Sequence, residues 1–206
     1  MEVRNFIAPV WSTVLFLLVA SFGTKLVSAD YNCWTYDGVC DFWSSSGTAL
    51  YQFWSKHDNF YEDRIWTIRN KAVPFWTDND YSTDYVNGWS QAFTWESSTQ
   101  YMRGWYSYHA NSEEDRRFKI RYSDLADGYT RGDCQWSGTN AYDGEYTFTR
   151  GSNYYAFGIK STNDDFHQDR TFSFLFCSVN APPPPAPPPP PPGSNGVPTV
   201  AIGVQA

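Results

Sequence analysis

Short runs in which apolar and polar residues alternate occupy most of the chain between residues 30 and 180, for example 50–54, 101–108 and 146–148. Such alternation is typical of strands that are buried on one side, because successive side chains of a strand point to opposite faces. Turn sequences such as Asp37-Gly38 and Asp143-Gly144 separate the runs. No stretch keeps an apolar period of 3.6 residues, so we predict an all-β domain.

One phrase occurs three times: an Asp-Arg pair followed by an alternating strand. The copies are DRIWTI at 63–68, DRRFKI at 115–120 and DRTFSF at 169–174. Their arginines are 116 − 64 = 52 and 170 − 116 = 54 residues apart. The pattern therefore predicts a single domain of three pseudo-repeats of about 53 residues, with a pseudo-threefold, trefoil- or prism-like arrangement.

The arginine of each phrase shares a strand face with the apolar residues that follow it, as Arg116 does with Phe118 and Ile120. A guanidinium on that side can lie on an aromatic ring and bind a carboxylate through two hydrogen bonds. We therefore favour a structural role for the motif over the alternative of direct ligand binding. Its residues are Asp63, Arg64, Trp66, Asp115, Arg116, Phe118, Asp169, Arg170 and Phe172.

The two ends of the chain differ from the domain between them. Residues 1–29 resemble a secretory signal peptide with cleavage before Asp30, the alternative being an uncleaved anchor helix. Residues 181–192 contain ten prolines and predict a polyproline stalk, followed by a disordered tail at 193–206. The domain thus covers 30–180, and we expect a secreted, extracellular protein without a transmembrane segment in the mature chain.

Composition narrows the function. Aromatic residues make up 19% of the chain and supply material for a core although Leu, Ile and Val are few. The net charge of −7 argues against nucleic-acid binding, which needs a basic face. Four cysteines follow the predicted cleavage point: Cys33, Cys40, Cys134 and Cys177. They predict two disulfides, for which three pairings are possible.

The third phrase, 169–177, ends in cysteine and resembles the repeated motif of the dermatopontin family, and Cys134 with Trp136 matches the start of a family repeat. The resemblance covers about residues 31–180. The first two phrases lack the closing cysteine, which marks a divergent, cysteine-poor member. The resemblance implies that Cys134 pairs with Cys177, which leaves Cys33 with Cys40.

The same resemblance implies a secreted, non-enzymatic adhesion protein that binds extracellular matrix proteins, glycosaminoglycans or cell-surface glycans. The alternative is a venom cytotoxin or haemagglutinin built on the same domain and stored in a venom capsule. The family also carries sulfated tyrosines, for which Tyr61, Tyr81 and Tyr85 are candidates because acidic residues surround them. The alternative for these positions is an ordinary acidic loop.

Exposed aromatic residues are the favoured binding candidates, because Trp and Tyr stack on sugar rings. We predict glycan-binding roles for Trp43, Trp95 and Arg103, and core positions for Trp54 and Trp105. We expect no catalytic residue, no cofactor and no metal site, although a calcium-dependent sugar enzyme is a third alternative. His57 and His109 each precede their Asp-Arg by seven residues, but Asn163 holds the third equivalent position, so a threefold imidazole cage is ruled out.

Overall fold

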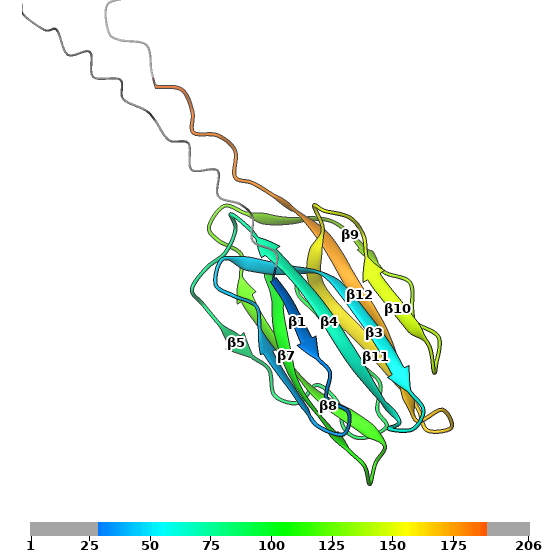
Figure 1. The fold of residues 1–206 in the computed structure, drawn as a ribbon. Helices are drawn as coiled ribbons and strands as arrows, with labels where there is room; N and C mark the ends of the chain where they lie inside the picture. The colour runs from blue at the N-terminus through cyan, green and yellow to red at the C-terminus, as the bar shows by residue number, and fades with distance from the viewer. Residues whose placement is uncertain (1–28, 189–206) are drawn as a thin grey trace, which may run out of the picture.

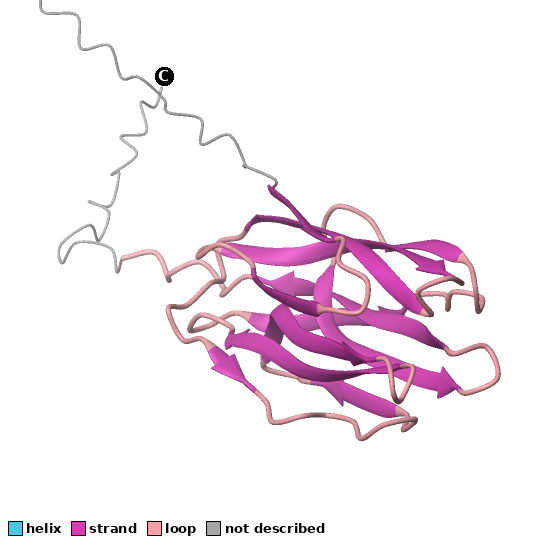
Figure 2. Cartoon of the chain, turned by 60° about the horizontal axis from the view of Figure 1, so that its bottom comes forward, coloured by secondary structure: helices cyan, strands magenta, loops and turns pink. Residues whose placement is uncertain are grey.

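The structure, a computed structural model, describes residues 29–188 and forms strands without any helix in that range (Figures 1 and 2). The twelve strands are β1 (Ala29–Cys33), β2 (Val39–Trp43), β3 (Thr48–Asp58), β4 (Asp63–Ala72), β5 (Tyr81–Ser82), β6 (Phe93–Glu96), β7 (Gln100–Ala110), β8 (Asp115–Asp124), β9 (Thr130–Trp136), β10 (Glu145–Thr149), β11 (Tyr155–Asp164) and β12 (Asp169–Asn180). The prediction of an all-β domain is confirmed.

Three long hairpins, β3–β4, β7–β8 and β11–β12, each form the centre of a four-stranded antiparallel sheet. An edge strand of the same repeat, β1, β5 or β9, pairs with the second strand of the hairpin. The other edge strand comes from the preceding repeat: β2 pairs with β7, β6 with β11, and β10 with β3. Because the third repeat gives its edge strand back to the first, the exchange of strands forms a closed ring. The prediction of three pseudo-repeats is therefore confirmed.

Aromatic rings from all three sheets meet in the core. Trp66 of β4 packs edge-on against Phe172 of β12, with ring centroids 4.9 Å apart, and Phe118 of β8 lies 5.7 Å from Phe172. These are the equivalent residues of the three Asp-Arg phrases, and all are at most 2% exposed. Each buried ring contributes about 1.5–3 kcal/mol, so the motif supplies much of the core.

Two disulfides join Cys33 to Cys40 and Cys134 to Cys177. The second links residues that face each other across β9 and β12, with Cα atoms 4.1 Å apart. The pairing implied by the family resemblance is therefore confirmed.

The chain leaves the domain after β12 at the end opposite the three long hairpin turns (Figure 1). Residues 181–188 of the predicted stalk contain neither strand nor helix, and Pro182 packs against Gly128. The predicted signal peptide, apart from Ala29 in β1, and the predicted tail lie outside the described residues.

Candidate functional site: a central ring and two exposed aromatic faces

The three Asp-Arg phrases join in a closed ring near the hairpin turns. Each guanidinium donates through Nε and Nη2 to both carboxylate oxygens of another repeat's aspartate, over 2.5–2.8 Å. The pairs are Arg64 with Asp169, Arg116 with Asp63, and Arg170 with Asp115. All six residues are at most 5% exposed. Every repeat thus donates to one neighbour and accepts from the other.

Each ring aspartate is also bound by its own repeat. Asp63 accepts hydrogen bonds from the Arg64 N–H at 2.7 Å and from the Asp37 N–H at 3.1 Å. Asp37 has a φ of 52°, a left-handed conformation that aims its amide at the carboxylate. Ser90 and Asp143 repeat this conformation beside Asp115 and Asp169. The carboxylates are thus fully used within the protein, as a structural role for the motif requires.

The pocket on the axis of this ring has a volume of only about 20 Å³. That is enough for one water and not for a sugar or a cofactor. A binding function is therefore to be sought on the outer faces of the sheets.

The outward face of β8 combines aromatic and basic side chains, and we call it the β8 face. Its residues are Trp43, Tyr85, Trp89, Tyr106, Tyr108, Arg117, Lys119 and Arg121. Alternation places the three basic residues outward while Arg116, Phe118 and Ile120 point into the core. The Arg117 guanidinium lies 4.2 Å from the centroid of Tyr85, and the Lys119 ammonium lies 4.7 Å from the same ring.

A buried asparagine holds the loop that carries Tyr85 and Trp89 against β8. The Asn87 side chain donates to the Arg116 carbonyl at 2.8 Å and accepts from the Phe118 N–H at 2.8 Å. These two bonds take the place of the backbone hydrogen bonds that an additional strand would make with β8. They fix Tyr85 and Trp89 on either side of Asn87, over the basic side chains.

The β8 face is locally positive although the whole chain carries −7. Asp41 neutralises Arg121, whereas Arg117 and Lys119 form no ion pair with any described residue. Burial, together with the neighbouring Tyr85, raises the pKa of Tyr106, so that its hydroxyl stays protonated. The face therefore offers two unneutralised cations, hydroxyl donors and aromatic rings.

A second surface is a groove over β3 and β4 with a volume of about 350 Å³, which we call the Trp34 groove. It is lined by Trp34, Gln52, Trp54, Thr67, Arg69 and Thr147. Trp34 is 63% exposed and donates from Nε1 to the Thr67 hydroxyl at 3.3 Å. Asp30 pairs with Arg69 at 3.3 Å, so this groove, unlike the β8 face, carries no excess charge.

Two predictions about single residues require correction. Trp54 lines the groove and is only partly buried, because Phe53 beside it takes the inward position on β3. Arg103 is 2% exposed and donates to Ser44, Ser123 and Asp80, so it cannot contact a surface ligand. A register shift between Met102 and Gly104 accompanies its inward turn, as β-bulges re-aim side chains. Trp105 is fully buried, as predicted.

The other predicted residues lie on or near the surface. Trp43 is half-buried under the Arg121 guanidinium at 4.7 Å, and Trp95 is half-buried beside Tyr122. Tyr61 and Tyr81 are each 41% exposed and accessible to modification. Their sulfation, like that of Tyr85, stays a prediction.

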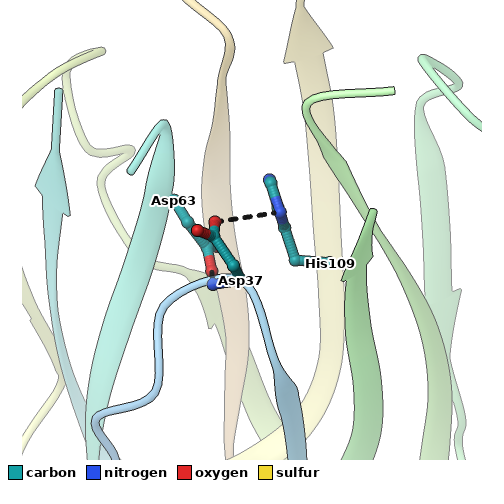
Figure 3. A group of neighbouring side chains, drawn as sticks. All are labelled: Asp37, Asp63 and His109. Carbon is teal, nitrogen blue, oxygen red and sulfur yellow. Dashed lines mark hydrogen bonds and ion pairs between the residues drawn. The ribbon is translucent and has the colours of Figure 1, made fainter. Parts of the chain in front are cut away.

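The three histidines occupy two kinds of position. His57 and His109 are buried, each beside two carboxylates. The groups are His57–Asp143–Asp169 and His109–Asp37–Asp63, and Figure 3 shows the second of them. These two groups are the places in the described chain where a cation could bind. His167 is half-exposed, and its N–H groups hold the pKa of Asp164 below its usual value.

Comparison with known proteins agrees with this architecture. The sequence model of the dermatopontin family matches residues 34–181. Millepora cytotoxin-1 of Millepora dichotoma is 29% identical over 143 residues, which cover 69% of this chain and 64% of the relative's length. The haemagglutinin/amebocyte aggregation factor of Limulus polyphemus is 30% identical over 176 residues, covering 79% of this chain and 95% of the relative.

No solved structure matches the chain significantly. The described residues contain no helix that could cross a bilayer. The match of the family model extends from just after β1 to the end of β12, and so includes all three Asp-Arg phrases. The chain therefore belongs to the dermatopontin family.

Proposed function

We propose that the protein is a secreted, non-enzymatic adhesion protein that binds anionic glycans of cell surfaces or the extracellular matrix through the β8 face. The observation that carries this proposal is the placement of Arg117 and Lys119, without acidic partners, on the ring of Tyr85. Sulfate and carboxylate groups of a glycan would pair with the cations, while sugar rings would stack on Trp89 or Tyr108.

The chain offers a second, different surface in the Trp34 groove. A protein with two separated binding surfaces can cross-link two cells, and several weak contacts raise the overall avidity. This is the property required of an agglutinin, and one relative is named a haemagglutinin/amebocyte aggregation factor. The likeness to that relative supports adhesion without identifying the ligand.

A non-catalytic function fits the chemistry of the surfaces. The carboxylates of the central ring are saturated with hydrogen bonds, and the ring pocket admits nothing larger than water. General acid-base catalysis requires a carboxyl group within reach of a substrate. The β8 face supplies recognition groups, and the carboxyl group of Asp41 beside it is paired with Arg121.

The test is binding to immobilised heparin, together with agglutination of erythrocytes, by the double variant Arg117→Ala/Lys119→Ala. Two half-buried cations at the surface contribute about 0.4–2 kcal/mol together, so affinity should fall roughly 2- to 30-fold and agglutination should decrease. The matched control is Lys56→Ala/Arg150→Ala, which removes the same charge from exposed positions outside the β8 face. Equal losses in both variants would show that net charge, and not this face, determines binding.

The alternative function is that of a cytotoxin, which the name of the Millepora relative suggests. Haemoglobin release, measured in the same erythrocyte assay, separates the two. Agglutination that heparin blocks, without lysis, supports adhesion. Lysis without agglutination would contradict the proposed adhesion and favour the cytotoxin.

A further inference from the structure

We propose that His109 and Asp37 form a binding site for a divalent transition-metal cation of the zinc type, at the seam between the first and second repeats. His109 lies near the end of β7, and Asp37 lies in the turn between β1 and β2 (Figure 3). The site is independent of the β8 face, so its test does not depend on the glycan proposal.

The first argument is that the imidazole of His109 lacks a hydrogen-bond partner. The side chain is 1% exposed, and neither Nδ1 nor Nε2 has a hydrogen-bond partner. Leaving a buried polar group unpaired costs about 1–3 kcal/mol, so such a group calls for an explanation, and a bound ion is one of them. Imidazole nitrogen is a common zinc ligand.

The second argument is the distance to Asp37. Its Oδ1 lies 3.4 Å from the Nδ1 of His109, which is long for a good hydrogen bond. Two ligands bound at about 2.0–2.1 Å to a tetrahedral ion lie about 3.3–3.4 Å apart. The separation is therefore the one that a shared zinc ion requires.

Charge and access complete the site. Asp63 is the third residue of the group. Its carboxylate already accepts hydrogen bonds from Arg116 and from two backbone amides, so it lies next to the ion without serving as a free ligand. Arg116 and Asp63 cancel each other's charge, which leaves the negative charge of Asp37 for the cation. The Asp37 side chain is 32% exposed, so water can supply the remaining ligands from that side.

The other two seams between repeats provide natural comparisons. At the seam between the third and first repeats, His57 of β3 stands beside Asp143 at 3.6 Å, but its Nδ1 is already hydrogen-bonded to Asn59 at 3.1 Å. At the remaining equivalent position the chain has Asn163 and Ser90, which supply neither imidazole nor a second carboxylate. The fold therefore accommodates asparagine and serine at these places. His109 is the buried histidine with neither ring nitrogen hydrogen-bonded, whereas in His57 only Nε2 is unpaired.

A bound ion would tether the turn between the two cysteines of the first disulfide, which contains Asp37, to β7 of the next repeat. Because a ligand that binds only the folded state stabilises it, Zn²⁺ at about a hundredfold excess over its dissociation constant should raise Tm by roughly 5–10 °C. The clamp would reinforce a seam that the Arg116–Asp63 pair already spans.

The experiment is titration of the purified protein, free of any polyhistidine tag, with Zn²⁺ by calorimetry and with Co²⁺ by visible absorption. We expect one ion per chain and a Co²⁺ spectrum with nitrogen coordination. His109→Asn copies Asn163 and should lower the affinity at least tenfold. His57→Asn is the matched control and should leave the affinity of this site unchanged.

If His109→Asn does not fold, as judged by near-ultraviolet circular dichroism, Asp37→Ser, which copies Ser90, provides the same test. Absence of Zn²⁺ uptake by the unaltered chain would overturn the proposal. So would uptake that survives both the His109 and Asp37 substitutions, because surface carboxylates would then hold the ion.

Discussion

Arg116→Ala is the most direct test of the central ring. The substitution removes two hydrogen bonds to Asp63, at 2.5 and 2.6 Å, and leaves that carboxylate buried at 4% exposure without its counter-charge. Loss of one partner of a buried ion pair costs about 3–5 kcal/mol. The Ser107 hydroxyl and the Gly38 and Thr35 carbonyls also lose a donor. We therefore expect a large loss of stability.

For a domain of this size, 3–5 kcal/mol lowers Tm by roughly 6–20 °C. Urea denaturation followed by Trp fluorescence measures the same loss, and heparin binding well below Tm should persist because the β8 face is intact. Arg69→Ala is the control, since it breaks an exposed pair with Asp30 that is worth at most about 1 kcal/mol. The reasoning is refuted if Arg116→Ala melts like the unaltered protein, and above all if it does so while binding is lost.

Three further predictions concern stability. Gly104→Ala should destabilise by at least about 1–3 kcal/mol, because the new Cβ would lie 2.2 Å from the Phe42 carbonyl oxygen, and a lowered urea midpoint would show it. Burial raises the pKa of Tyr101, so its contribution to stability is complete below the ordinary pKa of 10.0 and is lost as pH rises toward the folded-state pKa. The urea midpoint of unfolding should therefore decrease less between pH 9 and 11 in Tyr101→Phe than in the unaltered protein, and an equal decrease in the two would contradict this. Replacing Cys134–Cys177 with alanines should cost about 4 kcal/mol against about 2.5 kcal/mol for Cys33–Cys40, because the former closes the longer loop; equal Tm shifts would speak against the loop-entropy argument.

Much of the fold could be predicted from local pattern. The two-residue period identifies the strands and places Arg64, Arg116 and Arg170 inward, because alternation is a property of each strand alone. The exchange of edge strands between repeats could not be predicted in this way. Pairing of β10 with β3 joins residues about 90 positions apart, and only the assembled sheet determines it.

The site residues show where such reasoning fails. In a run such as Phe53-Trp54 both rings are candidates for the core, and the pattern does not say which faces inward. Arg103 turns inward at an irregularity of strand register; Gly104 beside it is a signal for such a bulge but does not say which side chain is re-aimed. The β8 face depends on Asn87, a residue that resembles an ordinary turn former until its bonds to β8 are seen.

The ring of exchanged strands fixes the number of repeats. An open array of repeats can gain or lose a copy at its end, because each copy contacts only its neighbours. Here removal of one repeat would leave one hairpin without its incoming edge strand, one strand without a hairpin, and an Asp-Arg pair unmatched. The domain therefore cannot gain or lose a repeat and still complete its sheets. New binding properties can arise only when the sequences of the three outer sheet faces diverge, and the charged β8 face and the uncharged Trp34 groove are two products of that divergence.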